Sequence, residues 1–293
     1  MTRCGRIILT WTFCLAVARA LAAAEPPADD VLWEAGIQYA TPGDRPLCLN
    51  LARPARGAGP FPAVLCIHGG GLCRGKRESC DALCRKLAGR GYVAATPSYR
   101  LAPEHRFPAA IHDVKAAVRW LRANAQTYAI DPERIAATGI SAGGYLAQFL
   151  AVTPRVARFE GDGGNPEQSS AVRCVVNVCG PSDFVSDWDT SVDGKDVLPK
   201  VLGGGLETHR AAYILASPLV WVTPEAAPTL CIHGTADRYV AHEQSQWLVE
   251  RLRAAGVEAD LLTLEGAGHG FKGADAERAD RALMEFLDGH LLR

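Results

Sequence analysis

The Gly-Ile-Ser-Ala-Gly stretch at residues 139–143, with a further glycine behind it, constrains the fold of this chain more than any other feature. Residues 134–138 before it have the composition of a short buried strand, and Tyr145–Val152 after it have the apolar spacing of a helix. A serine between glycines at such a junction lies on a sharp turn that strains its backbone and leaves no room for bulky neighbours. The turn lifts the hydroxyl of Ser141 clear of the sheet, at a helix N-terminus that favours negative charge. Ser141 is therefore a candidate nucleophile, and a glycine-rich turn with an incidental serine is the alternative.

Residues 1–24 have the features of a secretory signal peptide. A basic start is followed by an apolar run over 7–18 and by small residues at 20–24. The apolar run is shorter than the roughly 20 residues that a membrane span requires. We expect a secreted or periplasmic protein that has no membrane contact once the signal is removed.

From Phe61 onward, short apolar runs alternate with segments of helical spacing, a pattern typical of a parallel sheet with crossover helices. Before them, two segments of alternating polarity at 31–40 and 46–54 predict an antiparallel hairpin. Residues 25–293 are therefore predicted to form one α/β domain, a mostly parallel central sheet flanked by helices. Strands are expected at 63–68, 92–98, 134–139, 172–179, 228–233 and 260–264, and helices at 80–90, 109–128, 145–152, 242–255 and 276–292.

Residues 155–218 are the least regular part of this domain and are long enough to form a small irregular cap or lid over a site. Their scattered aspartates make the segment too polar for the apolar groove of a long-chain lipase. Trp188 is a candidate stacking platform for a sugar, although a half-buried aromatic is the preferred interpretation.

The charge and the cysteines exclude several functions. A formal net charge of −1 gives no basic surface for nucleic acid. Among the cysteines after the signal, Cys73, Cys80 and Cys84 are clustered, and one disulfide among them is an open alternative in an oxidising compartment. Cys80 and Cys84 also have the spacing of a metal pair, but no histidine accompanies them, so neither a metal nor another cofactor is expected.

Three glycines follow His68 at the end of a predicted strand. They let the backbone approach a bound carbonyl closely and direct N–H groups at it. The N–H groups of Gly70, Gly71 and Ala142 would then form an oxyanion hole, in which one donor is typically worth about 3 kcal/mol. A phosphate-binding loop is the weaker alternative, because no Lys-Ser/Thr pair and no G-x-G-x-x-G motif is present. His68 is expected to orient the loop.

A nucleophilic serine also needs a base and an acid. Asp237 and His269 each follow a predicted parallel strand, at the sheet edge where such folds bind ligands. Ser141 would attack a carbonyl, His269 would accept and return its proton, and Asp237 would hold the imidazole in the required tautomer. Asp183 also follows a strand and is the alternative acid. Asp237 is preferred because its loop follows the penultimate strand, as the chain order Ser, Asp, His anticipates.

Further motifs extend this pattern: His-Gly-Gly-Gly at 68–71, Ser-Tyr-Arg-Leu-Ala-Pro-Glu at 98–104, Phe-Pro-Ala at 107–109 with Asp113, and Gly-Ala-Gly-His-Gly at 266–270. Together with the serine turn they resemble the hormone-sensitive-lipase-like branch of the α/β-hydrolases. Within it the chain is similar to bacterial acetylxylan/feruloyl esterase-like enzymes of the BD-FAE type.

The chain departs from these relatives at two positions, where Leu72 replaces a usual aromatic residue and Ile140 stands where Gly, Asp or Glu is commoner. In the motif at 98–104, Arg100 and Glu104 are expected to pair near the glycines, and Asp113 to anchor the start of the following helix.

The resemblance implies an α/β-hydrolase fold and a cofactor-free serine esterase for short-chain carboxylic esters, among them acetyl or feruloyl esters of polysaccharides. Leu72 and Tyr145 are the candidate substrate-binding residues. An amidase, peptidase or lipase on the same fold is an alternative, because fold and triad do not fix the acyl group. A non-catalytic binding protein is the alternative of another class, and loss of the serine, aspartate or histidine would be its mark. The oligomeric state stays open.

Overall fold

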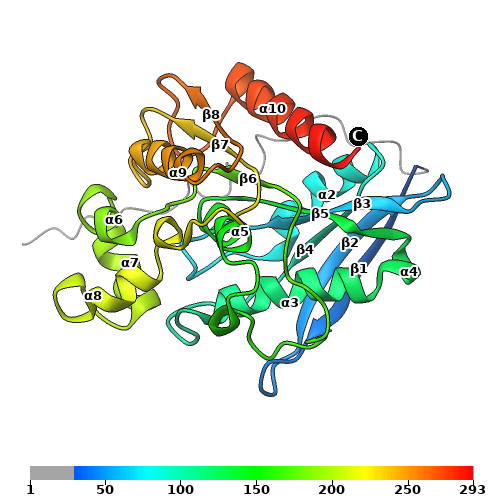
Figure 1. The fold of residues 1–293 in the computed structure, drawn as a ribbon, viewed down its shortest axis with the longest axis horizontal. Coiled ribbons are helices and arrows are strands. Elements are labelled where there is room, and N and C mark those ends of the chain that lie inside the picture. Colours follow the sequence, from blue (N-terminus) through cyan, green and yellow to red (C-terminus); the bar gives the residue numbers. More distant parts are fainter. Residues whose placement is uncertain (1–29, 293) are drawn as a thin grey trace, which may run out of the picture.

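The computed structural model describes residues 30–292, and the predicted signal peptide lies outside them. An eight-stranded sheet runs through the molecule in the order β1-β2-β4-β3-β5-β6-β7-β8 (Figure 1). β1 and β2 form the predicted antiparallel hairpin, β2 pairs antiparallel with β4, and all other pairs are parallel. The strands are β1 (Val31–Ala40), β2 (Leu47–Pro54), β3 (Phe61–Ile67), β4 (Val93–Pro97), β5 (Ile130–Ile140), β6 (Val175–Val178), β7 (Thr229–Gly234) and β8 (Ala259–Leu264).

Helices cover both faces of this sheet. α2 (Asp81–Ala88) and α10 (Gly273–Leu291) pack on one face, and α3 (Ala109–Ala123), α5 (Ala142–Val152) and α9 (Glu243–Ala254) pack on the other (Figure 1). Alternate residues of β3 therefore enter two different cores, because its side chains point to opposite faces. Strands buried on both faces read as unbroken apolar runs, which explains why the sequence revealed them. The predicted α/β fold is confirmed.

Short helices complete this framework: η2 (Arg77–Cys80), α4 (Ala125–Tyr128), η3 (Ala157–Phe159) and η4 (Pro218–Trp221). None of the helices within residues 30–292 is long and apolar enough to cross a membrane. The eight cysteines of this part of the chain are all free thiols, so the disulfide considered among Cys73, Cys80 and Cys84 does not form.

The boundaries at the serine turn differ from those predicted. β5 begins at Ile130, four residues early, and α5 begins at Ala142, three residues early. Gly143 and Gly144 are poor helix formers, so the sequence pattern pointed to a later start. Both are nevertheless required inside the helix, because a Cβ atom there would collide with Ile67 or Asn177.

The predicted cap divides into two parts. The first, before β6, packs along α3, where the carboxylate of Glu160 lies 2.8 Å from Lys115 and 3.0 Å from Arg119. The second forms three short helices at one end of the molecule (Figure 1), although an irregular segment was expected: α6 (Phe184–Thr190), α7 (Gly194–Leu202) and α8 (Leu206–Leu215). This second part reaches the predicted site, since a Cβ atom on Gly71 would lie 3.3 Å from Val197 of α7. We call α6–α8 and their connections the cap.

Candidate active site

Ser141 joins β5 to α5 with φ 57° and ψ −123°, a conformation that costs a non-glycine residue about 1–3 kcal/mol. Its N–H donates to the carbonyl oxygen of Val178 at 2.8 Å, and its own carbonyl accepts from the N–H of Tyr145 at 2.9 Å. Side chains at Gly139 and Gly143 would collide with surrounding backbone. The surrounding structure therefore fixes the strained turn and presents the Ser141 hydroxyl at the carboxyl end of the sheet.

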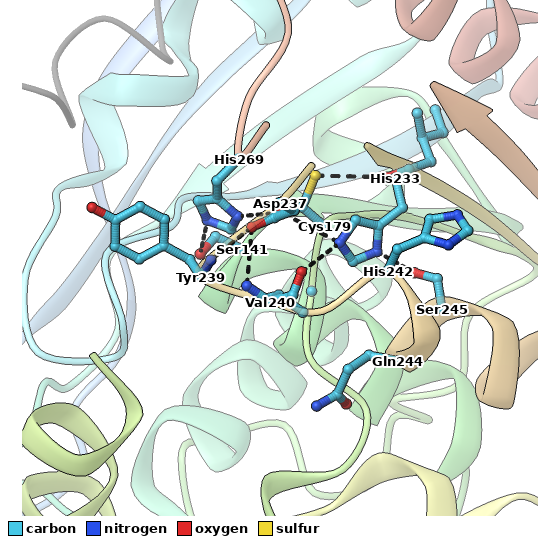
Figure 2. A network of polar contacts seen from close by, with 12 residues as sticks. Ser141, Cys179, His233, Asp237, Tyr239, Val240, His242, Gln244, Ser245 and His269 are labelled. Atoms are coloured by element: carbon cyan, nitrogen blue, oxygen red, sulfur yellow. Dashed lines mark hydrogen bonds and ion pairs between the residues drawn. The ribbon is translucent and has the colours of Figure 1, made fainter. Parts of the chain in front are cut away.

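The hydroxyl of Ser141 begins a continuous chain of hydrogen bonds (Figure 2). Its Oγ lies 2.9 Å from Nε2 of His269, and Nδ1 of His269 lies 2.7 Å from Oδ2 of Asp237. Because an ionised carboxylate only accepts, Nδ1 donates to it, and Nε2 of the neutral ring is left to accept the serine proton. The structure thus brings together the three residues that the sequence indicated, from the loops after β5, β7 and β8.

The carboxylate of Asp237 is fully buried and has several donors around it. Oδ1 accepts from the backbone N–H groups of Tyr239 at 2.9 Å and Val240 at 3.0 Å, and Oδ2 lies 3.3 Å from Nε2 of His233. Burial alone raises the pKa of Asp237, but hydrogen bonds from His233 and His269 overcome this effect and hold that pKa well below its usual range. Asp237 is therefore ionised at every pH near neutrality.

His233 is a site residue that the sequence reasoning set aside. Its ring is fully buried, Nε2 lies 3.0 Å from the carbonyl oxygen of Val240, and Nδ1 lies 2.7 Å from Oγ of Ser245 (Figure 2). A carbonyl only accepts, so Nε2 carries a proton that it shares between Val240 and Asp237. The ring joins the Asp237 loop to α9. The sequence did offer one indication of this role, since His233 is a polar residue at the end of an otherwise apolar strand.

Asp183, the alternative acid, makes different contacts. Its Oδ1 accepts from the N–H of Val185 at 2.9 Å and from the hydroxyl of Ser217 at 3.3 Å. It therefore caps the N-terminus of α6, whereas Asp237 binds His269.

The glycine loop is a tight turn that backbone hydrogen bonds stabilise. Gly70 and Gly71 have φ of 125° and 61°, and the carbonyl of Gly70 accepts from the N–H groups of Cys73 and Arg74, each at 3.1 Å. His68 orients this loop, as expected, because its Nδ1 donates to the carbonyl of Gly69 at 2.8 Å. Burial lowers the pKa of His68 and keeps its ring neutral.

Tyr99 and the N-terminus of α5 adjoin the predicted oxyanion donors. Tyr99 stacks on the His68 ring at 4.2 Å and donates its hydroxyl to the His68 carbonyl at 2.9 Å. Ala142 is the first residue of α5, where backbone N–H groups lack partners within the helix.

The expected pair between Arg100 and Glu104 does not form. Arg100 binds Asp113 instead, with Nη2 2.8 Å from Oδ1 and the backbone N–H 2.7 Å from Oδ2. Asp113 is buried in α3, and a buried carboxylate must be paired. Glu104 is 72% exposed and lies 3.3 Å from Arg45. Asp113 therefore fastens the loop at Arg100 to α3.

Leu72 and Tyr145 line a common small pocket, with an open volume of about 10 Å³, between the glycine loop, α3, α5 and α7. The ring of Tyr145 stacks on Phe184 of the cap at 4.7 Å. Within the described residues its buried hydroxyl has no hydrogen-bond partner. The two candidate substrate-binding residues are therefore placed together, one beside the glycines and one a helical turn after Ser141.

One group of potential metal ligands overlaps this site, since Cys179, Asp237 and His269 place ligand atoms within 4.8 Å of one another. Burial and the neighbouring Asp237 raise the pKa of the Cys179 thiol well above its usual range. A metal ligand must be the thiolate, so this donor set is poorly suited to a metal ion.

Comparisons with known proteins identify the family. The family model named BD-FAE matches residues 49–252. Esterase LipC of Mycobacterium tuberculosis is 36% identical over 225 residues, which are 75% of this chain and 55% of LipC. Ethyl acetate hydrolase of Pseudomonas putida is 32% identical over 245 residues, which are 78% of this chain and 73% of that protein. The chain thus spans about half the length of LipC and three quarters of the hydrolase.

Solved structures of esterases have the same fold. A truncated form of a carbohydrate esterase from gut microbiota superimposes with a TM-score of 0.80 at 27% identity, covering 92% of this chain and all of that one. A butyrate-bound thermophilic esterase from Thermogutta terrifontis superimposes with a TM-score of 0.74 at 26% identity, covering 87% of this chain and 93% of that one.

Proposed function

The chain belongs to the BD-FAE family of α/β-hydrolases, and from this premise we propose that it is a serine esterase that hydrolyses short-chain carboxylic esters. The observation that carries the proposal is the hydrogen-bond chain from Ser141 through His269 to Asp237. Such a chain supplies a nucleophile, a general base and an orienting acid in contact with one another. The retention of all three residues argues against a non-catalytic binding protein.

In the first half of the reaction, Oγ of Ser141 attacks the ester carbonyl carbon while Nε2 of His269 takes the hydroxyl proton. The carbonyl oxygen becomes an oxyanion that the N–H groups of Gly70, Gly71 and Ala142 stabilise, each worth about 3 kcal/mol. The bond to the alcohol oxygen then breaks, and that oxygen leaves with the proton from His269. An acyl-serine ester remains.

In the second half, water replaces the alcohol. His269 takes one proton from the water as its oxygen attacks the acyl carbon, and the same oxyanion forms again. The bond to Ser141 breaks and Oγ recovers the proton from His269, so the carboxylic acid leaves and the enzyme is restored. Asp237 keeps the imidazole in one tautomer and stabilises the imidazolium formed in each half.

The acyl group would enter the pocket beside Leu72 and Tyr145. The open space between its lining side chains is only about 10 Å³, so the pocket offers no preformed groove for a long acyl chain. The relatives include an ethyl acetate hydrolase and a butyrate-bound esterase, which supports short acyl groups. The carbohydrate esterase supports polysaccharide esters, such as acetyl or feruloyl esters, as natural substrates. The signal-like residues 1–24 support export to the periplasm or the medium, where such polymers occur.

The test is a set of hydrolysis rates for p-nitrophenyl esters from acetate to palmitate, beside acetylated xylan and methyl ferulate. Ser141→Ala should lower kcat by roughly 10⁴-fold or more, as removal of a triad nucleophile does in other hydrolases. Ser186→Ala in α6 is the matched control and should retain the wild-type rate. A Ser141→Ala variant that keeps wild-type turnover would refute the proposal.

A further inference from the structure

Tyr239 places an exposed aromatic ring beside the catalytic base. Its ring centroid lies 5.2 Å from that of His269, with 43° between the planes, and the residue is 37% exposed (Figure 2). The mechanism above assigns this ring no role. An aromatic side chain left half in solvent at the edge of a site offers apolar area to a ligand without further rearrangement.

The backbone around this ring is fixed on both sides. The N–H of Tyr239 donates to Asp237 at 2.9 Å, and the carbonyl of Arg238 accepts the N–H of Val192 from the cap at 3.0 Å. Val192 is itself 53% exposed, so this hydrogen bond joins two segments that each carry an exposed apolar residue. We call this junction of the cap and the Asp237 loop the rim.

The chemistry of the proposed function decides which half of the ester this rim faces. Nε2 of His269 returns its proton to the alcohol oxygen, so the alcohol leaves from the His269 side. In the proposed function the acyl half occupies the pocket lined by Leu72 and Tyr145, which lies beside the glycine loop. Tyr239 adjoins His269, and so it faces the alcohol half.

We propose that Tyr239 is the platform on which the sugar ring in the alcohol half of the substrate stacks. The inference rests on the proposed function and names the residue that recognises this sugar. A pyranose presents C–H groups on one face and hydroxyls around its edge, so it suits an aromatic ring that remains partly in water. A half-open platform also admits a ring within a longer polysaccharide, whereas a long apolar alcohol requires an enclosed groove.

The residue that the sequence singled out for this role is less suitable. Trp188 packs edge-on against Tyr213 of α8 at 5.7 Å and is partly buried, so its ring is occupied within the cap. The aromatic platform therefore comes from the loop that carries the acid.

The experiment compares esters that share one acyl group and differ in the alcohol: ethyl acetate, phenyl acetate and a mono-acetylated methyl xylopyranoside. The measured quantity is the ratio of kcat/KM for the xyloside to kcat/KM for ethyl acetate. Tyr239→Ala should lower this ratio about tenfold, which corresponds to the loss of about 1.4 kcal/mol of ring contact. Tyr239→Phe keeps the ring and should retain most of the ratio. Trp247→Ala is the matched control, since Trp247 is also 37% exposed but lies on α9.

The outcomes separate this inference from the proposed function. If the wild type hydrolyses ethyl acetate but Tyr239→Ala leaves the ratio unchanged, the inference is overturned and the esterase stands. If Tyr239→Ala affects phenyl acetate and not the xyloside, the platform takes aryl alcohols and the sugar assignment is wrong. If the wild type hydrolyses none of the three esters, the proposed function fails and the platform fails with it. Thermal unfolding of each variant verifies that it is folded.

Discussion

Replacing His233 with leucine should slow ester hydrolysis about tenfold, although His233 does not touch the substrate. The ring lies behind the acid, where Nε2–H is shared between the carbonyl of Val240 at 3.0 Å and Oδ2 of Asp237 at 3.3 Å. Without this donor, Asp237 keeps its two backbone donors but is free to rotate about them. The imidazole of His269 is then held less firmly toward Ser141.

The magnitude follows from the geometry. A hydrogen bond to a charged group contributes about 1.5–3 kcal/mol, and the longer branch of a shared donor belongs at the low end. A loss of about 1.4 kcal/mol in the transition state is a tenfold loss in kcat. The same change leaves the buried carbonyl of Val240 without its donor and removes the His233 partner of Ser245 Oγ, so the free energy of unfolding should fall by about 3 kcal/mol.

The assay measures kcat and KM with p-nitrophenyl acetate, and unfolding in urea, for His233→Leu and His233→Gln. The glutamine amide places a donor near the position of Nε2, so it should recover most of kcat. KM should change little in either variant, because His233 does not line the acyl pocket. If the two folded variants have equal kcat while their unfolding free energies differ, His233 acts on stability alone and the reasoning is refuted.

Four further predictions test the site. Asp237→Asn should lower kcat by roughly 10⁴-fold, whereas Asp183→Asn should only lower the unfolding free energy by about 1 kcal/mol; the reverse order would move the acid to Asp183. The wild-type kcat/KM should be highest for acetyl to butyryl esters and low by octanoyl, and Tyr145→Ala should move the maximum to longer chains; a wild-type maximum at decanoyl would place the enzyme among lipases. Burial lowers the pKa of His68, so the unfolded chain binds its proton first and stability should fall as the pH drops below about 6.5. Urea unfolding at pH 7 and pH 5 should show a smaller loss for His68→Asn, and equal losses would contradict this. Chelation with EDTA should leave the rate of hydrolysis unchanged, and inactivation would contradict a cofactor-free mechanism.

The sheet was predictable because strands β3, β4, β6 and β7 are buried on both faces and are therefore short apolar runs. The start of α5 was not predictable from helix propensity. Its first residues include glycines because a side chain there would collide with Ile67 or Asn177. The cap helices were missed for a related reason. They are short, and one contains Pro199, so their helical form depends on packing against one another.

The candidate site was predictable where chemistry is tied to strand ends. Ser141, Asp237 and His269 each follow a strand, and the topology alone brings such positions together. The predicted pairing of Arg100 with Glu104 was wrong. Glu104 is nearer in sequence, but the buried carboxylate of Asp113 needs a charged partner and therefore binds the guanidinium. Tyr239 could not be identified, because its place beside His269 depends on the path of the loop.

The position of β8 has a consequence for how the enzyme would lose its activity. β8 pairs only with β7, at the border of the described sheet, and the loop that follows it carries His269. Terminal elements open locally at a lower free energy than central ones. Fraying of β8 would withdraw the base while Ser141, after central strand β5, stays in place. Activity should therefore be lost at a lower temperature than the cooperative unfolding of the core. The catalytic rate would measure whether β8 is still paired with β7.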